Sequence, residues 1–396
     1  MTVGDTTAAG AVDERVRVEA VKLGRVMTAA LARRGVEEEH RAMVVEGLVG
    51  TSLRGIDTHG VRLFPTYLAE LDGGRADPRP TFTWHSRGHS RTAQPGKEDL
   101  LPQRNDWHLD ERQGETGENP RRKAGLLLDA GAALGLVAGT VAAREAARLA
   151  SEHGVGAVAV ANSNHFGAAS VYTLEMARRG ALGLSFTNSD ALVAPFGGQR
   201  PFFGTNPLSL AVAGDDGELF CVDMATSQVS YSRVKRAREA DDALEPGWAV
   251  GEDGGDAAAG DGEVSALSPL GGYKGQCLGM IVEVLCTLLT GEPFDHELSH
   301  LYVPPFDAPR RVGHLFVAFD VAHFTDPSRF RRRLAALLAM LRDQPAAGGE
   351  AVIAPGDLEA AAEADRRAHG IPLAADELHR FRTIDASAPE GDRVGL

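Results

Sequence analysis

The sequence predicts an α/β protein of two domains. Helix-like and strand-like segments alternate between residues 138 and 187, which is typical of α/β folds. The chain has 396 residues, enough for two domains of ordinary size. Its 43% hydrophobic content is that of a globular protein. No apolar run approaches the roughly 20 residues of a membrane span.

Charge and cysteine content exclude several classes of protein. The net charge is −14, and no basic patch suggests binding to nucleic acid. Residues 1–13 are small and polar, unlike a secretory signal. The three cysteines lie in apolar segments and are odd in number, which indicates reduced thiols rather than disulfides or a metal site. These features predict a cytoplasmic protein that works without membrane or nucleic acid.

The first quarter of the chain is expected to be helical. Apolar spacing predicts a helix over residues 13–35 that ends at Gly35, and a second over roughly 37–50. Tyr67 and Leu68 are expected on a short helix that ends at the Gly73-Gly74 turn. The stretch 84–123 is polar and rich in Arg, Glu, Gln, Gly and Pro, so we interpret it as a disordered or loosely attached insertion.

The remaining elements build the α/β part. Helices are expected over 138–153, 168–179, 275–290 and 328–342, and strands near 125–129 and over 155–161, 181–187, 208–212, 219–223 and 314–321. Residues 240–262 form an acidic Gly/Ala-rich loop, and 343–396 form a polar tail with a short helix near 357–369. No internal repeat is present.

The run Arg54–Arg62 holds a histidine, two arginines and two glycines in nine residues. Glycines permit tight turns where side chains converge, histidine exchanges protons near neutral pH, and arginine binds carboxylates with a planar fork. This set suits an enzyme acting on a small carboxylic acid. A polar loop that caps a helix explains the run about as well.

Further polar loops follow predicted strands. His165 lies in Asn162–Gly167, between a strand and a helix, where ligands of α/β proteins often bind; the alternative is a helix-capping run. Asp223 ends a strand and is either an N-cap or a carboxylate that orients a histidine or holds a ribose hydroxyl. Lys274, in the glycine loop Pro269–Gly275, could meet a phosphate or a substrate oxygen.

Several common signatures are missing. No G-x-G-x-x-G follows a strand, so the Rossmann fingerprint is absent. The chain also lacks a P-loop, H-E-x-x-H and G-x-S-x-G. His59 and His165 do not have the spacing of metal ligands.

Taken in order, these loops resemble the type 2 malate/L-lactate dehydrogenase family, whose members include ureidoglycolate and sulfolactate dehydrogenases and reductases of cyclic imino acids. The matching stretches are Arg54–Arg62, Asn162–Gly167, Gly204–Pro207, Asp223–Ser227, Pro246–Trp248 and Pro269–Gly275, with a weaker match over Gly349–Asp357. The resemblance covers about residues 14 to 373. It implies an oxidoreductase that uses NAD or NADP, a homodimer, and an active site between two domains.

The resemblance also implies domains and site residues. A non-Rossmann NAD(P)-binding α/β domain with a mixed sheet would span 124–313. A mainly helical substrate domain would combine 14–83 with a returning segment 314–373, and 1–13 and 374–396 would be flexible tails. His59 and His165 are alternative acid/base residues, with Asp223 orienting the imidazole, and Arg54, Arg62, Tyr67 and Lys274 would bind substrate. The implied cofactor contacts are His165, Phe166, Gly167, Ala168, Ala169, Asn188, Ser189, Asp223, Met224, Ala225, Pro355 and Gly356.

Some positions depart from the family pattern. Thr58 replaces the usual serine before the histidine, Tyr273 stands where a histidine is common, and Asp357 replaces the usual glutamate, without an obvious arginine near it. Residues 84–123 replace a shorter segment that usually is ordered.

We expect hydride transfer between the nicotinamide and C2 of a small 2-oxo or 2-hydroxy acid. A reductase of cyclic 2-imino acids is the nearest alternative, because both substrate classes share these motifs. A catalytically degenerate protein that binds a nucleotide or a partner is the alternative from another class.

Overall fold

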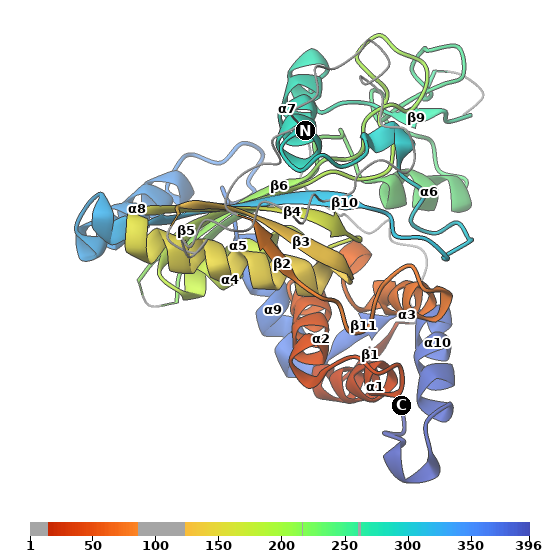
Figure 1. The fold of residues 1–396 in the computed structure, drawn as a ribbon. Coiled ribbons are helices and arrows are strands. Elements are labelled where there is room, and N and C mark those ends of the chain that lie inside the picture. The colour runs from red at the N-terminus through yellow and green to blue at the C-terminus, as the bar shows by residue number, and fades with distance from the viewer. Residues whose placement is uncertain (1–14, 86–122, 216, 260–262) are drawn as a thin grey trace, which may run out of the picture.

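The computed structural model describes residues 15–85, 123–215, 217–259 and 263–396. A central sheet separates two groups of helices, with α4 and α5 on one face and α7 on the other (Figure 1). The N-terminal and C-terminal helices gather together on the side of α4 and α5. This arrangement confirms the predicted α/β class with a mixed sheet.

Helices and strands alternate along much of the described chain. The helices are α1 (Ala20–Arg33), α2 (Glu38–Leu53), α3 (Phe64–Gly73), α4 (Gly135–His153), α5 (Ser170–Arg178), α6 (Tyr231–Glu239), α7 (Tyr273–Glu283), α8 (Pro327–Arg342), α9 (Asp357–His369) and α10 (Ala375–Ala386). The strands are β1 (Val16–Val18), β2 (Thr83–His85), β3 (Gly125–Ala133), β4 (Val155–Ser163), β5 (Ala181–Thr187), β6 (Leu208–Ala213), β7 (Leu219–Met224), β8 (Ala249–Val250), β9 (Ala266–Leu267), β10 (Val312–Asp320) and β11 (Ile371–Leu373).

The main sheet has seven strands in the order β2-β3-β4-β10-β5-β6-β7. Strands β3 and β4 are parallel, whereas β10 runs antiparallel to both of its neighbours, β4 and β5. Both faces are covered, so β4 and β5 carry apolar residues along their length. Because β10 runs antiparallel to both of them, β4 and β5 run in the same direction. Their carboxyl ends bring the loops after Ser163 and Thr187 to one edge of the sheet.

Segments from both ends of the chain pack together. Strand β1 pairs antiparallel with β11, and Phe64 of α3 stacks on Phe381 of α10 with ring centroids 6.1 Å apart. Leu23, Leu31 and Phe64 are fully buried in this core. The packing fixes α2, and with it the loop that carries His59.

The structure corrects several sequence-based expectations. Strand β10 lies in the middle of the main sheet, so the residues after 313 begin inside the α/β part instead of leaving it. Residues 375–386, expected in a flexible tail, form α10, because Leu378 and Phe381 bury one side of it. Residues 16–18, expected in a helix, form β1.

The predicted insertion is described only at its edges. Trp84 and His85 belong to β2 and pair with β3, so the insertion begins later than residue 84. Residues 86–122 lie outside the described residues, as do residues 1–14.

Candidate active site

The loop that carries His59 folds back on the end of α2. The Oγ atom of Ser52 accepts a hydrogen bond from the backbone N–H of Val61 at 3.0 Å. A Cβ atom at Gly60 would lie 2.0 Å from that Oγ and 3.0 Å from the backbone nitrogen of Ser52. Only glycine allows this close approach. The chain thus turns sharply after the 3₁₀ turn Asp57–His59.

His165 follows the end of β4, as predicted, and its loop is fixed by the residue before it. Asn164 is fully buried and donates from Nδ2 to the carbonyls of Ala132 and Ala133 at 3.0 Å each. Its Oδ1 accepts the backbone N–H of Arg310. Asn164 therefore connects three loops. Its side chain does not cap a helix, so the helix-capping alternative does not hold for this residue.

The two histidines come together although 106 residues separate them in the sequence. Their rings stack with centroids 5.9 Å apart and an interplanar angle of 20°. Nδ1 of His59 lies 2.8 Å from the hydroxyl of Thr58, and Nδ1 of His165 lies 2.8 Å from the hydroxyl of Tyr67. Neither Nε2 atom has a hydrogen-bond partner among the described residues. One nitrogen of each ring is thus held in place, and the other remains available to a ligand.

Burial keeps both imidazoles neutral. Loss of hydration, together with the charge of Arg62, lowers the pKa of His59 to about 4. Loss of hydration also lowers the pKa of His165 well below its usual value, with smaller effects from His59 and Arg310. Neutral rings can accept a proton or donate one hydrogen bond each.

Tyr67 and Arg62 flank the histidine pair differently from expectation. Tyr67 is buried and binds His165, so it orients an imidazole, the role that the sequence analysis gave to Asp223. Arg62 lies close enough for its charge to act on His59 and Tyr302. Its Nε is also 3.2 Å from a carboxylate oxygen of Glu377.

Sequence reasoning missed a buried charged layer behind Tyr67. Arg310 pairs with Asp190, and Arg75 lies 3.7 Å from Glu70, with all four side chains almost fully buried. Burial raises the pKa of Glu70 to about 7. The positive charge of Arg310 contributes to the lowered pKa of His165. These residues stand in no recognisable motif, and only their burial distinguishes them.

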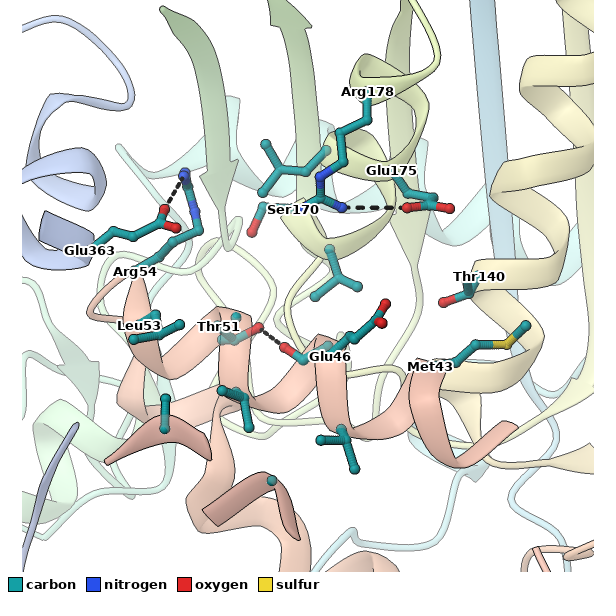
Figure 2. A pocket seen from close by; sticks show the side chains of 18 of the residues that line it. Met43, Glu46, Thr51, Leu53, Arg54, Thr140, Ser170, Glu175, Arg178 and Glu363 are labelled. Atoms are coloured by element: carbon teal, nitrogen blue, oxygen red, sulfur yellow. Dashed lines mark hydrogen bonds and ion pairs between the residues drawn. The ribbon is translucent and has the colours of Figure 1, made fainter. Parts of the chain in front are cut away.

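Arg54 occupies a second location. Together with α2 and α5 it lines a cavity of about 750 Å³, whose lining includes none of His59, Arg62, Tyr67 or His165 (Figure 2). The Arg54 guanidinium is 3.9 Å from Glu363, and its buried Nε and Nη2 atoms have no hydrogen-bond partner within the described part of the chain. A buried guanidinium with free donors is suited to an anionic ligand.

Asp223 belongs to the same location as Arg54. Its Oδ2 accepts the backbone N–H of Ser170 at 2.8 Å and so caps α5, and no contact joins it to His165 among the described residues. Loss of hydration raises the pKa of its carboxyl group, and the charge of Arg54 opposes that change. Asp223 therefore binds the start of α5 from a distant strand, which differs from the local N-cap that the sequence suggested, and its carboxylate lies within reach of the charge of Arg54.

The first residues before α9 also reach this location. Gly356 has φ +105°, and a Cβ there would lie 2.6 Å from the carbonyl oxygen of Leu219 in β7. The carbonyl of Pro355 accepts the N–H of Cys221 at 3.5 Å. The carboxylate of Asp357 accepts hydrogen bonds from Nε and Nη2 of Arg342. The sequence had not shown that an arginine would lie beside Asp357.

The other predicted contacts divide into structural and accessible residues. Phe166 is buried and stacks on His314 at 4.8 Å, and Asn188 is buried with its Oδ1 bound to the N–H of Gly313. Ser189 binds the backbone N–H of Thr205. Lys274 is exposed on the first turn of α7 and has no ion pair among the described residues. Gly167, Ala168 and Ala169 are buried between His165 and the start of α5, and Met224 and Ala225 are half-buried directly after Asp223.

The residues present fit a dinucleotide. The cavity is large enough for part of one, and the free donors of Arg54 fit a phosphate group. Within the described residues, no cluster of three or more His, Cys, Asp or Glu side chains is arranged to hold a metal ion. None of the described helices has the length and apolar character needed to cross a membrane.

The chain belongs to an oxidoreductase family. It matches the family described as Malate/L-lactate dehydrogenase over residues 18–98 and 114–382. It is 29% identical over 373 residues to a ureidoglycolate dehydrogenase (NAD(+)) of Escherichia coli O157:H7, covering 94% of this chain and 96% of that one. Relatives named for NAD(+) and for NADP(+) both occur. The protein is thus an NAD(P)-dependent dehydrogenase by family.

Solved structures support the same fold. A malate dehydrogenase of Entamoeba histolytica has a TM-score of 0.79 at 25% identity, with 95% of this chain and 99% of that chain covered. A delta1-piperideine-2-carboxylate reductase of Pseudomonas syringae has a TM-score of 0.73 at 24% identity, with 93% and 99% covered. The non-Rossmann α/β fold that the resemblance implied is therefore confirmed.

Proposed function

We propose that this protein transfers a hydride between the nicotinamide of NAD(P) and C2 of a small 2-oxo or 2-hydroxy acid. The observation that carries the proposal is the stacked histidine pair, in which each Nδ1 is held and each Nε2 is free. Such a pair can meet the oxygen on C2 from two ring nitrogens at once. The bound nicotinamide would supply or accept the hydride.

The two histidines would have different roles. The backbone N–H of Gly167 can only donate, and it reaches Nδ1 of His165 at 3.4 Å. A neutral His165 therefore carries its proton on Nε2 and would donate a hydrogen bond to the substrate oxygen. The hydroxyl of Thr58 can accept from Nδ1 of His59. This leaves a lone pair on Nε2 of His59, which would take the proton of a hydroxy acid and return it during reduction.

Two arginines would bind different ligands, one the substrate and the other the cofactor. Arg62, beside His59, would bind the substrate carboxylate, and that carboxylate would raise the pKa of His59 when it binds. Arg54, which the sequence analysis gave to the substrate, would instead meet a cofactor phosphate, because it lines the cavity next to Asp223. The carboxylate of Asp223 would accept a ribose hydroxyl.

The test is turnover of a substrate panel by His59→Asn and His165→Asn, followed at 340 nm with both cofactors. General acid–base catalysis typically contributes about 10²–10⁴-fold, so we expect a loss of that order for His59→Asn. His379→Asn, on the exposed side of α10, is the matched control and should keep full activity. Full turnover by both active-site variants would refute the assignment.

The same panel decides between the substrate classes. It contains 2-oxo acids, 2-hydroxy acids and cyclic 2-imino acids, since the histidine pair could protonate an oxygen or a nitrogen. Preference for a cyclic imine would favour the reductase alternative. Binding of NAD(P)H without oxidation by any compound would favour the degenerate binding protein.

We also propose a homodimer formed through α7 and the π-helical turn that follows it (Val284–Leu288). Tyr273, Met280, Ile281, Val284 and Leu288 recur at helical spacing and are exposed. This stripe contains no charged side chain, so a two-fold related copy could cover it although the chain carries a net charge of −14.

The dimer is tested by light scattering on a sizing column. Ile281→Glu should shift the mass from dimer to monomer, because a carboxylate would be buried twice in the interface. Leu337→Glu, on the exposed side of α8, is the control. A monomeric wild type would refute the dimer.

All three cysteines are free thiols, which supports action in the reducing cytoplasm.

A further inference from the structure

The C-terminal segment supplies a counter-charge to each charged residue of the His59 loop. Glu363 of α9 lies 3.9 Å from Arg54, and Glu377, just inside α10, lies 3.2 Å from Arg62. Arg366 of α9 forms a two-pronged ion pair with Asp57, and one prong, from Nη2 to Oδ2, measures 3.0 Å. These partners lie about 300 residues further along the chain.

The Arg366 contact is the strongest of the three. Its guanidinium is largely buried, with 13% of the side chain exposed, so the pair is only weakly screened by water. The same Nη1 atom that binds Asp57 also donates to the carbonyl of Ser52 at 2.5 Å. Arg366 therefore joins the C-terminal end of α2 to the first residue of the turn that carries His59.

That turn has little rigidity of its own. Its backbone bonds are long, with His59 N–H to Ile56 at 3.2 Å and Gly60 N–H to Asp57 at 3.3 Å. A single 3₁₀ turn is a weak element, and the next residue is a glycine. The direction of the imidazole therefore depends on the contacts at both ends of the turn: the ion pair of Asp57 before it and the bond from Val61 to Ser52 after it.

We propose that Arg366 is a positioning residue for His59, which it controls by holding the Asp57 carboxylate in its planar fork. This inference rests on the proposed function for its effect on turnover. Arg366 makes no contact with His59 among the described residues, so its action passes through the turn. The C-terminal segment, expected to end in a flexible tail, is by this inference part of the active-site architecture.

Kinetics gives the first test. Arg366→Gln should lower kcat about 10- to 100-fold, while the Kd for NAD(P)H, measured by fluorescence with the preferred cofactor, should stay nearly unchanged. Arg366→Lys keeps the charge without the fork and should recover part of the rate. Adding Asp57→Asn to Arg366→Gln should cost little more, because the two residues act as one unit. Arg380→Gln removes an exposed ion pair on α10 and is the matched control.

A second test needs no turnover. With ¹³C-labelled histidine, the His59 signal is assigned by its loss in His59→Asn and followed over pH. The wild-type signal should not titrate above about pH 5, since the pKa of His59 is about 4. In Arg366→Gln the ring should gain water and titrate closer to 6.5, whereas Arg380→Gln should match the wild type.

The two tests separate the two hypotheses. A wild type without turnover on any substrate refutes the proposed function, while the His59 titration still decides on Arg366. An unchanged titration and an unchanged kcat in Arg366→Gln overturn the positioning role. Equal losses of kcat, NADH binding and melting temperature would show a purely structural role and overturn it as well.

Discussion

Removal of one hydroxyl group tests how the histidine pair is held. Tyr67 is 1% exposed, and its hydroxyl oxygen lies 2.8 Å from Nδ1 of His165, a good length for a hydrogen bond. In Tyr67→Phe the ring and its packing remain, but Nδ1 keeps only the distant N–H of Gly167, at 3.4 Å. The imidazole can then rotate or change its tautomer.

The size of the effect follows from the burial of this bond. A buried polar group left without its partner costs about 1–3 kcal/mol. If that cost falls on the transition state, where His165 must donate from Nε2, the ratio kcat/KM falls about 5- to 150-fold. The affinity for NAD(P)H should stay unchanged, because Tyr67 is not among the residues that line the Arg54 cavity.

The assay compares kcat/KM and NADH affinity of the wild type, Tyr67→Phe and the control Tyr302→Phe. Tyr302 is 52% exposed and has no hydrogen bond from its hydroxyl to either histidine among the described residues. A Tyr67→Phe enzyme with wild-type kcat/KM, next to a His165→Asn enzyme without activity, would show that the tyrosine does not orient the histidine. The reasoning from the 2.8 Å contact would then be wrong.

Three more outcomes follow from the geometry. The folded-state pKa of His59 is lowered to about 4. The kcat/KM for hydroxy-acid oxidation should therefore stay constant from pH 7 to pH 5, where a base of ordinary pKa would lose about 30-fold of its activity. A bend of the pH profile near pH 6.5 would contradict the lowered pKa. Arg54→Gln should raise the Kd for NAD(P)H by about 10-fold or more in a fluorescence titration, and Arg380→Gln, an exposed arginine outside the cavity, should not. Gly60→Ala should lower both melting temperature and kcat, whereas Gly391→Ala, whose Cβ meets no atom within 4 Å, should leave both intact.

The sequence predicted the fold where local pattern decides it. Strands such as Ala181–Thr187 have no exposed residue on either face and appear as apolar runs between helices. The place of β10 could not be predicted, because its pairing with β4 and β5 depends on segments more than a hundred residues away. Strands β1 and β11 have three residues each, too few for any periodicity.

The sequence identified the loops of the site, but not which side chains contact each other there. Both histidines were found from their motifs, and the structure stacks them. Their neighbours were not, because Tyr67 and Asp223 are equally good candidates in a sequence, and only the fold places the first next to His165. The ion pair between Asp57 and Arg366 spans 309 residues, and no spacing rule links such positions.

The hydrogen bonds of a polar residue show whether it is structural or available to a ligand, a choice that the sequence left open. Asn164 and Asn188 are buried in motif loops with both side-chain groups bound to backbone, so they can only build the walls of the site. His59, His165 and Arg54 each keep a nitrogen without a partner among the described residues. A buried donor or acceptor without a partner costs stability. Arg54 bears this cost at its buried Nε and Nη2 atoms, which an anion would satisfy, whereas the Nε2 atoms of the histidine pair are open to a substrate oxygen.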